Sequence, residues 1–210
     1  MSIAAILRRP AAEAIAELDP FDARLDGTLY IAQVCDRPVT DQDVADHVAT
    51  YRIQRPPLRG TDLERYRTSL TLARLRTEGK SLLVGDGTLS TEASTPFVLA
   101  GIEYPSLRLF YEALKLDPEQ RAAFLAEPSR ITRRRRAAAF GYRGMTIAVG
   151  STSHLQLIAE ATSAKVDAHA QVRRDLRATG RARLFMGTVH SQPLGRVVPF
   201  AYMIERQRLG

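Results

Sequence analysis

Two lysines offer the clearest route to covalent or base chemistry in this chain. Only three of its 30 basic residues are lysines, and two of them, Lys115 and Lys165, lie at the edges of apolar stripes. Burial lowers the pKa of a lysine, and a neutral amine is what Schiff-base or general-base chemistry requires. A lysine beside an apolar stripe also commonly lays its stem along that stripe and keeps its ammonium in water, so both interpretations stay open.

Lys115 also belongs to a row of charged residues. Arg108, Glu112 and Lys115 recur at i, i+4 and i+7, which places them on one stripe of a helix expected over residues 105–116. The neighbouring stripe is apolar and consists of Leu107, Phe110, Tyr111 and Leu114. Periodicity alone is also compatible with a surface helix that carries a weakly stabilising Arg–Glu pair. Spacing by itself therefore does not identify the row as a functional site.

A second predicted helix, over residues 153–178, carries Lys165. It is either one long helix or two helices joined near residues 165–167, and Thr179-Gly180 ends it. Four residues share one face of its first part: His154, Ile158, Ala161 and Lys165. His169, Val172 and Leu176 continue that face if the helix is unbroken.

Composition narrows the classes of protein. The chain has 210 residues, a formal net charge of +7 and a single cysteine, so a disulfide framework is excluded and a cytoplasmic protein is expected. The four histidines have no short ligand spacing, and we expect no metal and no cofactor. No apolar run approaches the roughly 18 residues of a membrane span. The run 133–136 is four arginines, which is either the exposed end of a helix or a polyanion-binding element for nucleic acid.

The elements that must position these residues fall into two parts. Residues 1–80 are expected to be a mostly helical segment of unknown role, with one helix from Pro10 to Leu18. In residues 81–210 we expect helices over 105–116, 119–136 and 153–178, and strands over 82–84, 95–99, 102–104 and 145–149. Ala100-Gly101 predicts a tight hairpin, and residues 184–186 and 197–203 are apolar and expected to be buried.

Several of these segments resemble one known family. The resemblance begins with Leu89-Ser90-Thr91, continues through residues 95–106 (TPFVLAGIEYPS) and reaches residues 110–115 (FYEALK). Residues 144–158, Lys165, the stretch LRATG at 176–180 and residues 198–206 follow in the same order. Together they resemble the NADAR family, the riboflavin-intermediate N-glycosidase-like proteins, over residues 81–208.

The resemblance implies a mainly helical α+β fold and cleavage of the N-glycosidic bond between a ribose and a base or amine. Implied partners are phosphorylated ribosyl or ADP-ribosyl small molecules, such as ribosylamino-pyrimidine phosphates or ADP-ribosylated guanine. A carboxylate near the sugar and a proton donor to the leaving nitrogen are then required. On this basis the catalytic residues are Glu112, Lys115 and Lys165. The residues that contact the substrate are Arg108, Tyr111, Thr91, His169 and His154.

The polar positions of the family pattern are largely changed in this chain. Family members usually carry Glu at Arg108 and an aromatic-Gln pair at Tyr111-Glu112. They also carry Asn at Thr91, Gln-Asn at Ala168-His169 and a late His at Met186. Two accounts follow. Glu112, one turn from Arg108, has taken over the carboxylate's role, or the protein is catalytically inactive and serves a binding or structural function.

Overall fold

The structure, a computed structural model, has a mixed α/β fold. It describes residues 9–17, 81–128, 138–180, 182–186 and 193–210. The helices are α2 (Ala11–Glu17), α6 (Leu107–Ala113), α7 (Pro118–Ala126), α8 (Thr152–Ala168), α9 (Ala170–Ala178) and α10 (Leu194–Arg208), with the 3-10 turn η1 (Gly87–Leu89). The strands are β1 (Ser81–Leu83), β2 (Phe97–Leu99), β3 (Ile102–Tyr104), β4 (Ala139–Tyr142), β5 (Met145–Ala148) and β6 (Arg183–Phe185).

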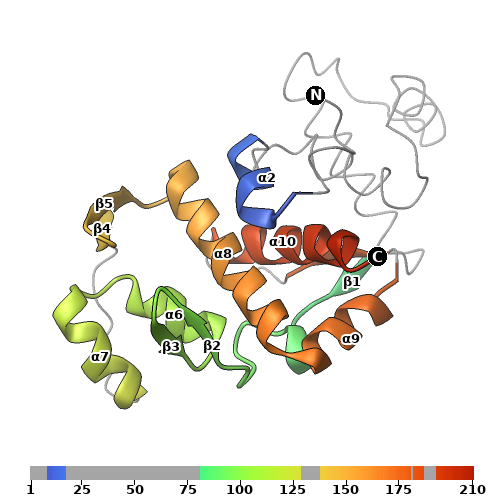
Figure 1. Cartoon of the computed structure of the whole chain (residues 1–210), viewed down its shortest axis with the longest axis horizontal. Coiled ribbons are helices and arrows are strands. Elements are labelled where there is room, and N and C mark those ends of the chain that lie inside the picture. Colours follow the sequence, from blue (N-terminus) through green and yellow to red (C-terminus); the bar gives the residue numbers. More distant parts are fainter. Residues whose placement is uncertain (1–8, 18–80, 129–137, 181, 187–192) are drawn as a thin grey trace, which may run out of the picture.

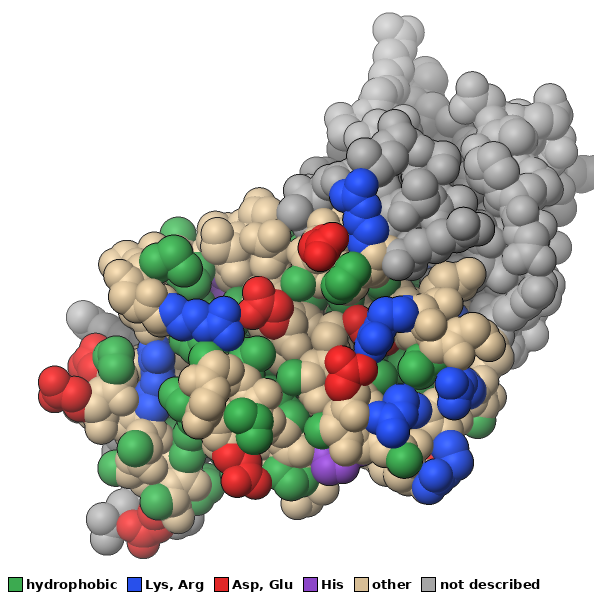
Figure 2. Space-filling view, viewed as in Figure 1, with side chains coloured by type: hydrophobic (Ala, Val, Ile, Leu, Met, Phe, Trp, Pro, Cys, Tyr) green, Lys and Arg blue, Asp and Glu red, His purple; other side chains and the backbone are tan. Residues whose placement is uncertain are grey.

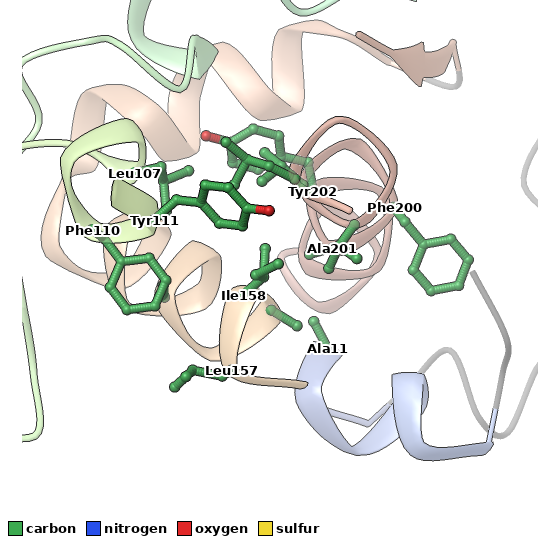
Figure 3. Packing of buried hydrophobic residues seen from close by; sticks show 14 of the residues in the cluster. Ala11, Leu107, Phe110, Tyr111, Leu157, Ile158, Phe200, Ala201 and Tyr202 are labelled. Carbon is green, nitrogen blue, oxygen red and sulfur yellow. The ribbon is translucent and has the colours of Figure 1, made fainter. Parts of the chain in front are cut away.

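Helix α8 is the centre of the packing. It contacts α2, α6, α10 and strand β2 (Figure 1). Figure 3 shows how side chains of α6, α8 and α10 converge, with Tyr111, Ile158 and Tyr202 pointing into one cluster. All three side chains are buried, and Ala11 of α2 joins the same core. The helix predicted from Pro10 is confirmed as α2, and the boundary at residue 80 between two parts stays a prediction.

The face of α8 predicted from spacing is the buried one. His154, Ile158, Ala161 and Lys165 are each at most 2% exposed. The helix starts at Ser151, whose hydroxyl accepts a hydrogen bond from the His154 amide at 3.4 Å. The interpretation as two helices is confirmed, but the break lies at His169, whose extended backbone (φ −123°, ψ 112°) separates α8 from α9.

Three two-stranded sheets surround these helices. Strands β1 and β6 pair in parallel, whereas β2–β3 and β4–β5 are antiparallel hairpins. The predicted hairpin is confirmed, with Phe97 opposite Tyr104 and a turn at Ala100 (φ 54°) and Gly101 (φ 77°). Positive φ at both turn residues matches the right-handed twist of the flanking strands.

The helix expected over 119–136, with an interruption at Pro128, ends at Ala126, just before that proline, and residues 129–137, including the arginines at 133–136, lie outside the described residues. Other elements differ from the sequence predictions. Strand β4 was not predicted. Residues 197–203 belong to the helix α10, which the sequence indicated only as a buried apolar segment. Within the described part of the chain, none of the helices is long and apolar enough to cross a membrane.

Arg121 joins the α6–α7 region to the β4–β5 hairpin. Its side chain is only 5% exposed, and its Nε donates to the Ala113 carbonyl oxygen at 3.1 Å. Its Nη2 donates to the Gly141 carbonyl oxygen. One buried guanidinium thus satisfies backbone acceptors at the end of α6 and in β4, which holds the end of α6 in place.

The β2–β3 turn yields a stability prediction. Ala100 adopts a left-handed conformation at an exposed position, where a residue with a β-carbon is strained and Asn is tolerated. Ala100→Asn should therefore raise the free energy of unfolding by about 0.5–1 kcal/mol, measured by urea denaturation. Gly101→Ala should lower the free energy of unfolding by about 1 kcal/mol, because alanine is strained at the φ of 77° that this position adopts. Steric contact does not contribute, since a β-carbon there meets no atom within 4 Å. A stabilised Gly101→Ala variant would contradict this turn geometry.

Candidate functional site

The charged row on α6 forms a continuous set of ion pairs. Ser106 caps the helix by accepting a hydrogen bond from the Leu109 amide at 3.1 Å. Arg108 Nε lies 3.4 Å from Glu112 Oε1, one turn further along the helix, and Lys115 Nζ lies 2.6 Å from Glu112 Oε2. The side chains of Arg108 and Lys115 are 39% and 37% exposed, and that of Glu112 is 16% exposed. The carboxylate is therefore held between two cations that reach solvent.

Aromatic rings lie beneath this row. The Tyr111 ring stacks on the His154 ring of α8, with centroids 5.8 Å apart and planes 17° apart. Lys115 Nζ lies 4.9 Å from the centroid of Tyr111. Phe140 of β4 meets the His154 ring edge-on at 5.0 Å. The α6 row and the start of α8 thus share one packed unit, which joins five of the predicted site residues: Arg108, Glu112, Lys115, Tyr111 and His154.

His154 is a neutral, buried ring. Its Nδ1 accepts a hydrogen bond from the Gly150 amide at 2.9 Å, so the proton of the neutral ring lies on Nε2. Burial lowers the pKa of His154 to about 4, because the charged form loses its hydration. At neutral pH His154 therefore contributes an uncharged surface to Tyr111 and cannot serve as a cation for a phosphate.

Lys165 is buried deeper than Lys115. It is 0% exposed, its Nζ donates to the Ser90 carbonyl oxygen at 2.8 Å, and the Tyr202 ring centroid lies 5.9 Å away. Burial lowers the pKa of Lys165 from 10.5 to about 7. Among the residues that the structure describes, no carboxylate pairs with this amine, so its charge is uncompensated when it is protonated.

The segment Ser90-Thr91 connects Lys165 to α6. The Ser90 carbonyl receives Lys165 Nζ, and the next carbonyl, of Thr91, accepts a hydrogen bond from the Arg108 backbone amide at 2.8 Å. Thr91 itself is 0% exposed. The start of α6 is therefore fixed beside the Lys165 amine, while Lys115 lies at the other end of α6, beside Tyr111.

His169 lies apart from this set. Its ring Nε2 is 2.6 Å from the Pro96 carbonyl oxygen, at the junction of α8 and α9. This contact attaches the helix junction to the chain just before β2. Among the described interactions, His169 meets none of the other predicted site residues.

A hollow of about 290 Å³ lies between η1, β1 and α9. Its wall consists of Leu82, Asp86, Gly87, Thr88, Leu89, Asp175, Ala178 and Thr179. Thr88 Oγ1 donates to Asp175 Oδ2 at 2.5 Å across this hollow. None of the residues predicted for the site belongs to its wall. No local pattern indicates this pair, because its members are 87 residues apart in the chain.

Neither a metal-ligand cluster nor a similar known protein assigns a function to this site. In the described ranges, no three His, Cys, Asp or Glu side chains gather as they would around a metal ion. Comparison with protein-family models, curated proteins and solved structures finds no match to this chain.

Lys165 produces a testable dependence of stability on pH. The unfolded lysine keeps its proton up to about pH 10.5, whereas the folded lysine releases it near pH 7. Between these values the unfolded state binds more protons, so the free energy of unfolding rises with pH. From pH 7 to 9 we expect a rise on the order of a few kcal/mol, because one pKa unit corresponds to about 1.4 kcal/mol.

Urea denaturation at pH 7, 8 and 9 measures this rise. In Lys165→Met it should disappear, because the buried amine that releases a proton in this range is then absent. Lys115→Met is the control and should keep the rise, since its ammonium is partly exposed. An unchanged pH dependence in Lys165→Met would show that Lys165 is not the group responsible.

Proposed function

We propose that this protein binds a phosphorylated ribosyl or ADP-ribosyl small molecule along the α6 row, as an N-glycosidase-like protein with a changed site. The observation that carries the proposal is the Arg108–Glu112–Lys115 row, with both oxygens of one carboxylate held by partly exposed cations. Guanidinium and ammonium groups suit phosphate oxygens, and a carboxylate suits ribose hydroxyls. The NADAR resemblance supplies the class of ligand.

The packing under the row supports binding at a defined geometry. Tyr111 is 5% exposed and fixed between His154 and Lys115, so the α6 side chains stand on a rigid base. The Arg108 amide is bonded to Thr91, which adds a second attachment at the start of the helix. Less conformational entropy is then lost when a ligand orders Arg108 and Lys115.

Binding without efficient turnover is the form that the charges favour. A carboxylate stabilises a developing oxocarbenium ion only as far as its charge is free to face the sugar. Here Arg108 and Lys115 already occupy the two Glu112 oxygens. A cation beside the sugar also repels the positive charge that forms there, which raises the barrier to cleavage.

Hydrolysis of the N-glycosidic bond is the second candidate, and one contact favours it. Lys115 Nζ lies 2.6 Å from Glu112 Oε2, which places a proton donor directly beside a carboxylate. Cleavage needs these two groups, the donor for the leaving nitrogen and the carboxylate for the sugar. Lys165 is less suited to donate a proton to the leaving nitrogen, because its amine is enclosed by Ser90 and Tyr202.

Calorimetric titration with ADP-ribose and with ribose 5-phosphate tests the binding proposal. Arg108→Ala should weaken binding about 10–100-fold, because a hydrogen bond to a charged group contributes roughly 1.5–3 kcal/mol. Arg143→Ala is the matched control. Arg143 is 45% exposed and lies 3.6 Å from Glu160, so it resembles Arg108 in exposure and pairing but lies on another element. Equal losses in both variants, or no binding by the wild-type protein, would refute the proposal.

Release of free base from a ribosylamino-pyrimidine phosphate and of ADP-ribose from ADP-ribosylated guanine tests hydrolysis. If Glu112 is catalytic, Glu112→Gln should lower the rate about 100-fold or more, because electrostatic stabilisation of the transition state is lost. Arg108→Glu should raise the rate, because it removes a repelling cation and adds a carboxylate. No release at enzyme concentrations near those of the substrate, with ligand binding retained, would leave the protein as a binding protein alone.

A further inference from the structure

Helix α9 carries arginines whose charges no carboxylate neutralises. Arg173 Nη1 donates to the Val166 and Asp167 carbonyl oxygens, Arg174 to the Gln171 side-chain oxygen, and Arg177 Nη2 to the Leu209 carbonyl oxygen. Within the described part of the chain, all acceptors of these three guanidinium groups are uncharged oxygens. This distinguishes α9 from α6, where the Glu112 carboxylate pairs with both Arg108 and Lys115.

The end of α10 borders this basic surface but adds no free charge to it. Arg208 Nη2 lies 2.6 Å from Asp167 Oδ1, and its Nε lies 2.6 Å from Glu205 Oε2, so two carboxylates compensate its charge. Arg173 donates to the carbonyl of the same Asp167, and Arg177 reaches Leu209, the residue after Arg208. The basic surface itself therefore consists of the three α9 arginines. Figure 2 shows Lys and Arg side chains gathered over the lower right of the molecule, where Figure 1 places α9.

The spacing of these arginines suits a phosphate backbone. Arg173 and Arg177 are four residues apart on one helix, which corresponds to a rise of about 6 Å. Each guanidinium has five N–H donors, and the contacts given above use only one or two of them. The acceptors hold the groups in place, and the remaining donors of Arg174 and Arg177 can reach solvent because both residues are exposed.

The surroundings of the patch favour nucleic acid over a membrane. The apolar residues of α9, Val172 and Leu176, are buried, and the large exposed apolar residues of the described chain all lie on β1, β2, β3, β5 and the residue after β5. A helix that lies in a lipid surface needs an exposed apolar face, which α9 lacks. Phe200 and Tyr202 of α10 are also buried, so the patch has no aromatic platform of the kind that binds single strands.

We propose that α9 forms a surface, here called the α9 patch, that binds the phosphate backbone of double-stranded nucleic acid without sequence specificity. The α9 patch consists of Arg173, Arg174 and Arg177. It is independent of the ligand proposed for the α6 row, because α9 packs on η1, α8 and α10, whereas α6 packs on β3, α7 and α8.

Fluorescence anisotropy with a labelled 20-base-pair DNA duplex tests this proposal in the full-length protein. Arg174→Ala should weaken binding about tenfold at 0.1 M salt, and the slope of log affinity against log salt should become less steep by about 0.9, as expected for one phosphate contact. Arg174→Glu should weaken it further. Arg174 is the first choice because its described hydrogen bond goes only to Gln171, so its replacement leaves the contacts between helices intact.

Arg143→Ala and Arg143→Glu are the matched controls, at the turn between β4 and β5. They change the net charge by the same amount as the Arg174 variants but lie outside the α9 patch, so they should alter binding much less. Equal effects at the two positions would overturn the proposal, since they would indicate a response to net charge alone. Replacement of arginines 133–136 by alanine tests whether that run, rather than the α9 patch, binds the duplex. Loss of binding only in that variant would also overturn the proposal.

Competition distinguishes the kinds of partner. Unlabelled duplex should displace the labelled duplex at lower concentration than poly-L-glutamate of equal charge. Displacement by the two polymers at equal concentration would instead indicate an acidic protein as partner and refute the nucleic-acid proposal. Thermal unfolding of the Arg174 variants at the wild-type temperature would confirm that weaker binding reflects a lost contact.

Discussion

The hydrogen bond between the Lys165 amine and the Ser90 carbonyl is the contact on which the position of the α6 row depends. It attaches the segment after η1 to the last turn of the central helix α8, and the adjacent Thr91 carbonyl then fixes the first turn of α6 through the Arg108 amide. A buried lysine without a carboxylate partner costs free energy when it is charged. Its lowered pKa reduces this cost, because the neutral amine still donates the hydrogen bond.

Helices α6 and α9 show two ways in which arginine is used in this chain. On α6 the guanidinium faces a carboxylate one turn away, and a second cation pairs with the same carboxylate, so one of the two positive charges is compensated. On α9 the guanidinium groups are bound to neutral oxygens and keep their full charge. A row that holds both cations and a carboxylate on a rigid base suits a small ligand with both phosphate and hydroxyl groups. An excess of positive charge on an exposed helix suits a polyanion, whose binding releases counterions.

The sequence predicted those parts of the fold in which a local pattern determines structure. Ala100-Gly101 predicted the hairpin, and the spacing from His154 to Lys165 predicted the buried face of α8. The sequence did not predict helix α10, because residues 197–206 are buried on all sides and no polar face produces a helical period. Pro199 also argues against a helix interior. Strand β4 is short and contains Gly141, which weakens any strand signal.

The site was predictable only as far as its residues share one helix. Spacing alone indicated the row of Arg108, Glu112 and Lys115, but the stacking of Tyr111 on His154 and the bond from Lys165 to Ser90 join positions 43 and 75 residues apart, which periodicity does not encode. These long-range contacts also determine which groups carry charge. Because burial keeps His154 neutral and brings Lys165 close to neutrality, neither adds much to the surface potential near pH 7. That potential is set mainly by exposed arginines, whose charge hardly changes with pH. Binding at the α9 patch should consequently respond to salt much more than to pH between about 6 and 9.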